Sequence, residues 1–351
     1  MANPSPLLPQ FEKAEALMMS WGDAVQIVSE FASLEIEYAT IRKGAALMDC
    51  PHRGLLKLTG SDRVDFLHRM VSNSVKDLSP GQLRRAFILT AKGRILADLL
   101  IVHDAQYTLI DLDVHQADTV ATELDNLLFG EDVQIENLSG SYHRLSLHGP
   151  KAPEAAEHIE GLDGYRFEYA ETGETGCHLW APVDEITAAI LDDDRFKPIG
   201  WGAFNIARIE AGRPMFNIDF GPDSLPHETG VLDEAASFTK GCYRGQEIVA
   251  RMQSLGHPSK KLVGFRADGD LLPLAGTGIL DAEGSDAATV GAVTSSTYAP
   301  MLSKSPIGFA MVKWGHHEDG CKLFAPAEGV NVPIQIHPLR FYQRESSAPS
   351  T

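Results

Sequence analysis

The stretch Lys240-Gly241-Cys242-Tyr243-Arg244-Gly245-Gln246-Glu247 places a thiol between two cations and follows it with an amide and a carboxylate. A cysteine reacts as its thiolate, and a nearby cation favours that form. The two glycines indicate tight turns or a close approach of the backbone to a ligand. The residues alone therefore leave two interpretations open, a reactive sulfur or a buried structural cysteine in a turn before a helix.

The bulk properties describe a protein of two or three domains. The chain has 351 residues and carries 48 acidic against 30 basic residues, a formal charge of -18. This charge argues against non-specific attraction to nucleic acid or to an anionic membrane surface. We expect no secretory signal in the first ten residues and no membrane span, because no apolar run is long enough to cross a membrane.

The cysteines indicate a reducing compartment. The chain has four of them, and they are scattered without a Cys-x-x-Cys pair or a histidine cluster, which predicts neither a disulfide framework nor a zinc site. We therefore expect a cytoplasmic protein without a bound metal. The four are Cys50, Cys177, Cys242 and Cys321.

Hydrophobic spacing predicts α+β organisation in the first two thirds of the chain. Residues 1–34 are expected to be a helix-rich lead-in. Strands then precede helices twice, and the strongest helical stripe runs over 114–129. The other predicted elements are strands at 56–58, 86–90, 95–102, 107–112, 133–135, 145–147, 166–169 and 177–181, and helices at 64–71, 153–159, 184–191 and 201–211.

Two later stretches differ from this pattern. Residues 213–230 are rich in glycine and proline, and an irregular run of this length is too long for a simple connector, which suggests a function. From Pro258 onward, short strands separated by turns predict an all-β module, a barrel or a sandwich. Residues 344–351 are expected to be a disordered tail.

Three further residue groups are candidates for chemistry. Asp98 lies in the apolar run 95–102, so it either faces a cavity, pairs with a cation such as Arg94, or faces solvent on an edge strand. Glu210, near the end of a predicted helix, can accept paired N–H bonds from a heterocycle, although a solvated glutamate fits equally. For residues 226–228, turn formation is the favoured interpretation.

The octet 240–247 resembles the signature of the YgfZ family of folate-binding proteins, which act in iron–sulfur cluster maturation and repair. That family is related to the glycine-cleavage T-protein, an aminomethyltransferase. The resemblance covers about 39–338, and it departs from the family at Arg244, where an uncharged residue is usual. It is also carried by the segments Gly44-Ala45-Ala46-Leu47-Met48-Asp49, Gly60-Ser61-Asp62-Arg63-Val64-Asp65-Phe66-Leu67, Gly93-Arg94-Ile95-Leu96-Ala97-Asp98 and Arg208-Ile209-Glu210-Ala211-Gly212.

The resemblance implies roles for individual residues. Asp98 matches the catalytic aspartate of the T-protein, and Glu210 matches the glutamate that contacts the pterin. Asp111 stands where the T-protein has a folate-contacting asparagine. We therefore expect the catalytic residues to be Cys242, Asp98 and Lys240, and the folate-binding residues to be Glu210, Asp111, Tyr243, Arg244, Gln246 and Glu247.

The resemblance also implies the fold, an α+β, T-protein-like arrangement of three domains in a clover around a folate channel. Two α+β domains are expected to be interleaved in sequence, followed by an antiparallel β-barrel. The expected boundaries are 35–60 with 140–250 for the first domain, 61–139 for the second and 256–343 for the barrel.

Three functions follow as hypotheses. The first is a tetrahydrofolate-binding protein that supports assembly or repair of iron–sulfur enzymes through Cys242, with those enzymes or their assembly factors as partners. The second is a folate-dependent aminomethyltransferase or methylamine demethylase in which Asp98 orients the amine. The third is a non-catalytic folate-sensing scaffold, so the sequence leaves enzymatic activity open.

Overall fold

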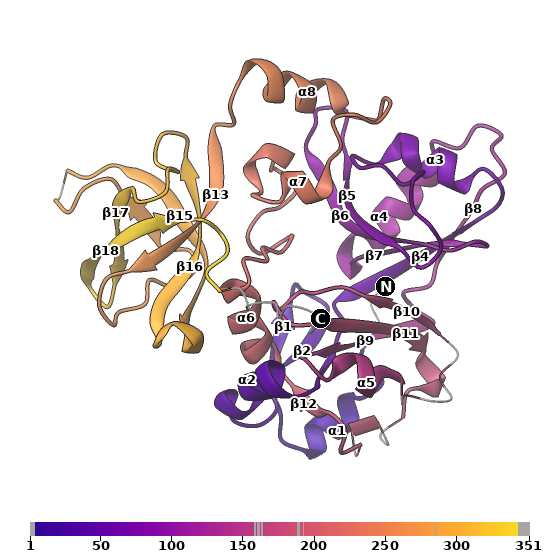
Figure 1. Ribbon diagram of the computed structural model, residues 1–351, viewed down its shortest axis with the longest axis horizontal. Helices are drawn as coiled ribbons and strands as arrows, with labels where there is room; N and C mark the ends of the chain where they lie inside the picture. Colours follow the sequence, from indigo (N-terminus) through magenta and orange to yellow (C-terminus); the bar gives the residue numbers. More distant parts are fainter. Residues whose placement is uncertain are drawn as a thin grey trace, which may run out of the picture.

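The computed structural model describes residues 4–342 apart from 158, 160, 161, 163, 188, 189, 192 and 285. Its strands form a two-stranded hairpin, two five-stranded sheets and a closed barrel. Figure 1 shows the barrel on the left and the two sheets stacked on the right, with α7 and α8 crossing between the barrel and the upper sheet. The predicted three-lobed α+β fold with a C-terminal antiparallel barrel is therefore confirmed.

The lower sheet has the strand order β10-β11-β9-β3-β12, and β12 runs parallel to β3 while the other pairs are antiparallel. Both faces of β3 are covered, because Leu47 packs on one side with α5 and Met48 on the other with α6. Every residue of this short strand is consequently buried. The elements are β3 (Ala46–Asp49), β9 (Tyr142–His148), α5 (Ala152–Glu157), β10 (Tyr165–Glu168), β11 (Gly176–Pro182), β12 (Lys197–Ile199), α2 (Leu34–Lys43) and α6 (Trp201–Glu210).

The upper sheet is fully antiparallel in the order β5-β6-β7-β4-β8. Helix α4 lays Ala117, Val120 and Leu124 on this sheet, as its apolar stripe predicts. The helix ends at Asp125, and Phe129 beyond it is exposed. The elements are β4 (Arg53–Thr59), α3 (Arg63–Met70), β5 (Leu83–Leu89), β6 (Ile95–His103), β7 (Thr108–Asp113), α4 (Val114–Asp125) and β8 (Gln134–Asn137).

The structure differs from the sequence-based expectation in the lead-in. Among residues 4–30, which the structure describes, only α1 (Leu8–Lys13) is an α-helix, and β1 (Leu17–Trp21) and β2 (Val25–Glu30) form an antiparallel hairpin. The helix-rich prediction for 1–34 was therefore wrong there, because Val25 and Ile27 alternate into the core at the period of a strand.

The structure also bears on an expected domain boundary and on a predicted helix. The chain passes from the lower to the upper sheet between Asp49 and Arg53, so β4 pairs in the upper sheet although the expected boundary lay after residue 60. The helix predicted over 184–191 includes residues outside the described part, and its start is the 3₁₀ turn η1 (Val183–Glu185). The expected tail 344–351 also lies outside the described residues.

The barrel closes in the order β13-β16-β15-β14-β17-β18, as the run of short strands predicts. Alternate side chains of β13, including Val263 and Phe265, fill its interior. The strands are β13 (Lys260–Ala267), β14 (Gly278–Leu280), β15 (Thr289–Ala299), β16 (Ser305–Lys313), β17 (Lys322–Ala327) and β18 (Val330–His337), with the 3₁₀ turn η4 (Pro300–Leu302) after β15.

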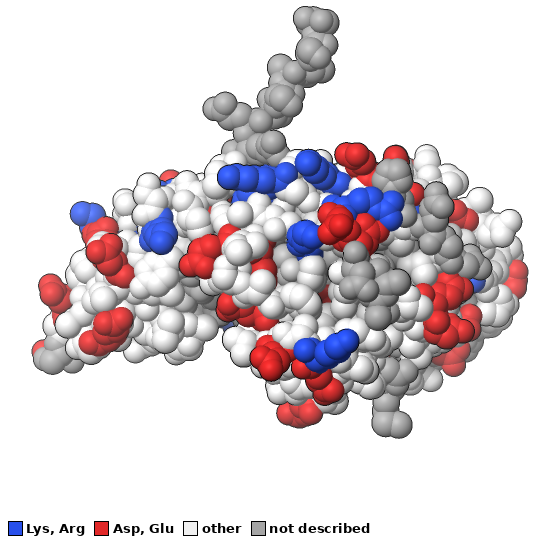
Figure 2. Space-filling model, turned by 90° about the horizontal axis from the view of Figure 1, so that it is seen from below, with Lys and Arg blue, Asp and Glu red and all other residues white. Residues whose placement is uncertain are grey.

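The connection from α6 to the barrel is mostly irregular. It contains the 3₁₀ turn η3 (Pro226–Glu228), α7 (Leu232–Ala235) and α8 (Gln246–Leu255). Within the described part of the chain, no helix has the length and apolarity needed to cross a membrane. Figure 2 shows that Lys and Arg lie among Asp and Glu on the face in view, with acidic side chains towards both ends.

Candidate functional site

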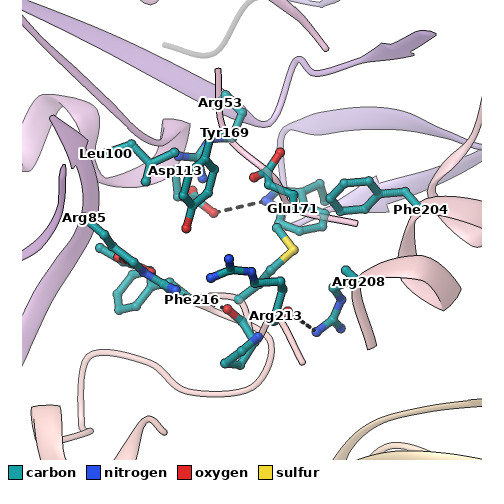
Figure 3. A pocket seen from close by; sticks show the side chains of 14 residues that line it. Arg53, Arg85, Leu100, Asp113, Tyr169, Glu171, Phe204, Arg208, Arg213 and Phe216 are labelled. Atoms are coloured by element: carbon teal, nitrogen blue, oxygen red, sulfur yellow. Dashed lines mark hydrogen bonds and ion pairs between the residues drawn. The ribbon is translucent and has the colours of Figure 1, made fainter. Parts of the chain in front are cut away.

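A small cavity lies where the hairpin, the two sheets and α6 meet. Figure 3 shows its aromatic and charged side chains converging from these separate elements. The lining residues are Trp21, Arg53, Arg85, Asp98, Leu100, Asp113, Tyr169, Glu171, Phe204, Arg208, Arg213, Pro214, Met215 and Phe216.

Asp98 is held in this cavity by Arg85. The guanidinium donates from Nε to Oδ1 at 3.0 Å and from Nη2 to Oδ2 at 2.5 Å. Burial opposes the charge of Arg85, but the adjacent carboxylate of Asp98 outweighs it and raises the pKa of the guanidinium. Of the alternatives that the sequence left open, Asp98 thus takes a cavity position and also pairs with a cation, and that cation is Arg85. Arg94 instead donates to the carbonyl of Asp223.

Glu210 lies outside the set of described residues that line the cavity. Its side chain is fully buried, and Oε2 accepts hydrogen bonds from Tyr38 Oη at 2.5 Å and Arg42 Nη2 at 2.6 Å. Oε1 accepts from the backbone N–H of Met301 at 3.1 Å. In this arrangement Glu210 joins α2 and α6 to the first turn after β15.

Asp111 is also fully buried, behind the cavity and between the two sheets. Arg53 donates from Nε at 2.8 Å and Trp180 donates from Nε1 at 2.9 Å. Arg144 approaches the same carboxylate at 3.4 Å. Because these partners come from both sheets, Asp111 connects the sheets to each other.

The octet 240–247 lies before and within the start of α8, away from the described lining of the cavity. Cys242 is exposed there. Lys240 places its ammonium on backbone carbonyls at the end of α3 and beyond it, at 2.6 Å from Val71 O and 3.0 Å from Asn73 O. Burial lowers the pKa of Lys240 to about 8.

The other members of the octet anchor it. Tyr243 is buried with the core that includes Phe87 of β5. Burial raises the pKa of Tyr243 to about 12. Arg244 pairs with Glu123 of α4 at 2.8 Å. Gln246 and Glu247 form the first turn of α8.

Two family models match the chain, one over its N-terminal half and one over its C-terminal barrel. The GCVT N-terminal domain matches residues 9–179, and the glycine cleavage T-protein C-terminal barrel domain matches residues 260–343. The chain belongs to the glycine-cleavage T-protein superfamily. The first match covers the two sheets up to β11, and the second covers the closed barrel.

Full-length relatives in the T-protein superfamily agree with these matches. An aminomethyltransferase of Desulfitobacterium hafniense is 26% identical, with 97% of this chain and 98% of the relative covered. An aminomethyltransferase of Caldanaerobacter subterraneus is 27% identical, with 97% and 96% covered. The crystal structure of glycine cleavage system aminomethyltransferase T from Bartonella henselae superposes with a TM-score of 0.88 at 23% identity, covering 98% and 99% of the chains, and confirms the T-protein fold.

The structure thus places only Asp98 of the expected site residues on the cavity wall among the described residues. It adds Arg85, Tyr169 and Glu171, which the sequence analysis did not single out. Arg85 could have been noticed as a charged residue within a predicted strand. Tyr169 and Glu171 gave no such signal, because they lie at the start of a glycine-containing loop whose position depends on tertiary packing.

Proposed function

We propose that the protein is a tetrahydrofolate-dependent one-carbon transferase of the aminomethyltransferase type. The observation that carries this proposal is Asp98, held by two hydrogen bonds from Arg85 on the wall of a cavity with aromatic sides. The aminomethyltransferase relatives support it, because they match nearly the whole chain. A cytoplasmic location remains our expectation.

The side chains on the cavity wall suit the ring of a folate in chemical type. Trp21, Tyr169 and Phe204 offer aromatic surfaces to a flat ring, and carboxylates on the wall can accept hydrogen bonds from its N–H groups. Tetrahydrofolate would supply the nitrogen that accepts the one-carbon unit. Asp98 would orient the amine of the donor, since Arg85 fixes the direction of its carboxylate.

The test is turnover by the purified protein. Tetrahydrofolate and candidate aminomethyl donors are incubated with it, and both 5,10-methylene-tetrahydrofolate and ammonia are measured. We expect Asp98→Asn to lower turnover by about 100-fold or more, since that carboxylate acts at the reacting amine. Asp77→Asn is the matched control, because Asp77 pairs with Arg84 outside the cavity. Equal turnover in the two variants contradicts the proposal.

A second candidate is support of iron–sulfur enzymes through Cys242, as in the YgfZ family. The observation that favours it is the exposure of this thiol, in contrast to the buried Cys50. The test is rescue of an iron–sulfur enzyme in cells that lack the native gene, with Cys242→Ala compared with Cys321→Ala. Full rescue by both variants excludes this role. Transferase turnover that survives Cys242→Ala favours the first candidate.

A further inference from the structure

The arginines on the cavity wall differ in how firmly their partners hold them. Three of them pair with buried or largely buried carboxylates, since Arg53 pairs with Asp111, Arg85 with Asp98 and Arg208 with Asp219. Moving a guanidinium away from such a partner leaves an uncompensated buried charge, so these three stay in place. The fourth described arginine of the wall is Arg213.

Arg213 pairs instead with a carboxylate that faces solvent. Its Nη1 donates to Glu234 of α7, at 2.8 Å from Oε1 and 2.7 Å from Oε2. The two side chains are 22% and 44% exposed, and water competes strongly for a pair of this kind. Figure 3 shows the side chain of Arg213 directed into the cavity, below Tyr169 in this view. Arg213 can therefore exchange its partner for a ligand at low cost.

The backbone around Arg213 is fixed, although the end of its side chain is not. Its N–H donates to the carbonyl of Arg208 at 2.9 Å, and the carbonyl of Pro214 accepts from Arg85 Nη2 at 3.4 Å. The guanidinium carbon lies 5.8 Å from the ring centroid of Tyr169. These contacts keep the guanidinium on the cavity wall if Glu234 leaves it.

Glu234 also connects Arg213 to the expected catalytic aspartate. Its Oε2 lies 3.9 Å from Arg85 Nη1, and Arg85 uses its other edge, Nε and Nη2, for Asp98. The two carboxylates and two guanidiniums balance in charge, so displacing Glu234 leaves one positive charge, one guanidinium away from Asp98. Each oxygen of Asp98 retains a lone pair for a further donor. The site thereby offers a carboxylate to an ammonium group and a guanidinium to an anion.

We propose that Arg213 binds the carboxylate of an amine donor of the amino-acid class whose nitrogen is held by Asp98, and that Glu234 competes for the same guanidinium in the ligand-free protein. This inference rests on the proposed function, because it names the class of donor that Asp98 orients. The planar fork of arginine suits a carboxylate in geometry as well as in charge. The glutamate of tetrahydrofolate also carries carboxylates, but it is remote from the nitrogens that accept the one-carbon unit.

The experiment compares a zwitterionic probe with its amide. N-methylglycine and N-methylglycinamide are titrated calorimetrically, under anaerobic conditions, into the full-length protein saturated with tetrahydrofolate. The probes share their amine and methyl group, and the amide lacks the negative charge. We expect a preference of about 10-fold to 100-fold for N-methylglycine, which Arg213→Met should bring towards one. Arg69→Met is the matched control, because its pair with Glu131 is exposed and lies outside the described lining of the cavity.

A second variant should change the affinity in the opposite direction. Glu234→Gln keeps the size of the side chain but removes the competing charge, so N-methylglycine should bind about 2-fold to 5-fold more tightly. Glu131→Gln is its control. The inference is overturned if the unaltered protein shows no preference, if Arg213→Met keeps the preference, or if Glu234→Gln binds no more tightly than its control.

A further titration distinguishes the donor from the folate as the source of the carboxylate. Tetrahydrofolate and tetrahydropteroate, which lacks the glutamate, are titrated into the parent and into Arg213→Met. The ratio of their affinities should be the same in both proteins. A changed ratio assigns Arg213 to the glutamate of the folate and overturns the inference. If the unaltered protein does not bind tetrahydrofolate, the proposed function fails, which is a separate result.

Discussion

Arg85 and Asp98 form an ion pair whose side chains are only 8% and 12% exposed. The preceding residue of β5, Arg84, pairs with Asp77, and these two side chains are 28% and 56% exposed. The two pairs have the same chemistry in different surroundings. Removing one partner of a buried pair leaves an uncompensated charge, whereas an exposed charge is solvated by water.

We therefore expect Arg85→Met to lower the free energy of unfolding by about 3 kcal/mol. Arg84→Met should lower it by less than about 1 kcal/mol, because solvent screens that pair. Urea denaturation monitored by circular dichroism measures both. Similar losses in the two variants would show that Asp98 is solvated without its partner.

The sequence predicted single residues only in part. It allowed a cavity position for Asp98, but the partner of Asp98 depends on strand register. Asp98 lies opposite Phe87, which makes Arg85 a diagonal neighbour on the adjacent strand, while Arg94 precedes the strand. The catalytic roles of Cys242 and Lys240, and the folate contacts of Glu210, Asp111, Tyr243, Arg244, Gln246 and Glu247, remain predictions.

At the scale of elements, the β5–β6 hairpin supports the start of α8. Gly245 has φ +80°, and a Cβ there would lie 2.6 Å from the carbonyl oxygen of Thr90 in the hairpin turn. A Cβ on Gly93 would lie 2.8 Å from Cβ of Ile248. Close packing of the hairpin turn against the start of α8 thus explains both glycines. It connects the Cys242 loop to the hairpin that carries Asp98.

Gly245→Ala should lower the free energy of unfolding by about 3 kcal/mol, since it adds a clash to the strain of a left-handed backbone. Gly81→Ala is the control. Its φ is +84° but no atom lies within 4 Å of the added Cβ. The control should lose only about 1 kcal/mol. Thermal unfolding in a calorimeter measures the loss of unfolding free energy in each variant. A loss in Gly245→Ala that is no larger than the loss in Gly81→Ala contradicts the packing argument.

The lower sheet carries histidines that stay neutral inside the core. Burial lowers the pKa of His148 on β9 to about 4, although Glu171 works in the opposite direction. Between this pH and the ordinary histidine value of about 6.5, the unfolded chain binds the proton more readily than the folded chain. The free energy of unfolding therefore falls as the pH drops from about 6.5 to 4.

His148→Gln should make this acid dependence shallower by about 3 kcal/mol across that interval. The amide of glutamine can still bond Ser146, which lies 2.9 Å from His148 Nε2. Urea titrations at several pH values measure the slope, with His316→Gln on a barrel loop as the control. If the free energy of unfolding of His148→Gln falls with pH as steeply as that of the parent, other groups cause the acid sensitivity.

The sequence predicted the secondary-structure elements better than it predicted which elements pack against one another. The stripe of α4, the β5–β6 hairpin and the barrel strands follow from local periodicity, and the structure confirms them. The β1–β2 hairpin was missed because its strands are short and mixed in apolar spacing. Its burial against α6 depends on contacts distant in sequence.

At the scale of the molecule, Arg208 joins the barrel to the two-sheet body. It donates from Nη1 to Asp219 at 2.5 Å and from Nη2 to Ser295 Oγ of β15 at 2.6 Å. Asp219 in turn accepts from Ser295 at 2.6 Å. The side chains of Arg208 and Asp219 are almost completely buried. One guanidinium therefore connects α6, the irregular segment and the barrel.

Arg208→Met should lower the free energy of unfolding by about 3 to 5 kcal/mol and increase cleavage by proteases at residues 256–259, before the barrel. Arg213→Met is the control, because its pair with Glu234 is 22% and 44% exposed and should contribute less than about 1 kcal/mol. Limited proteolysis with mass spectrometry measures the cleavage. Equal cleavage in both variants shows that other contacts hold the barrel.

The order of β3 and β4 along the chain has a consequence for synthesis. All partners of β4 lie at or before residue 137, so the upper sheet is complete once that residue has left the ribosome. Strand β3 precedes it, yet its partners among the described strands are β9 and β12, which both come later in the chain. The nascent chain must therefore carry an unpaired apolar strand past a finished sheet. The time until residues 142–148 emerge is the interval in which this strand is most exposed to aggregation or to chaperone capture.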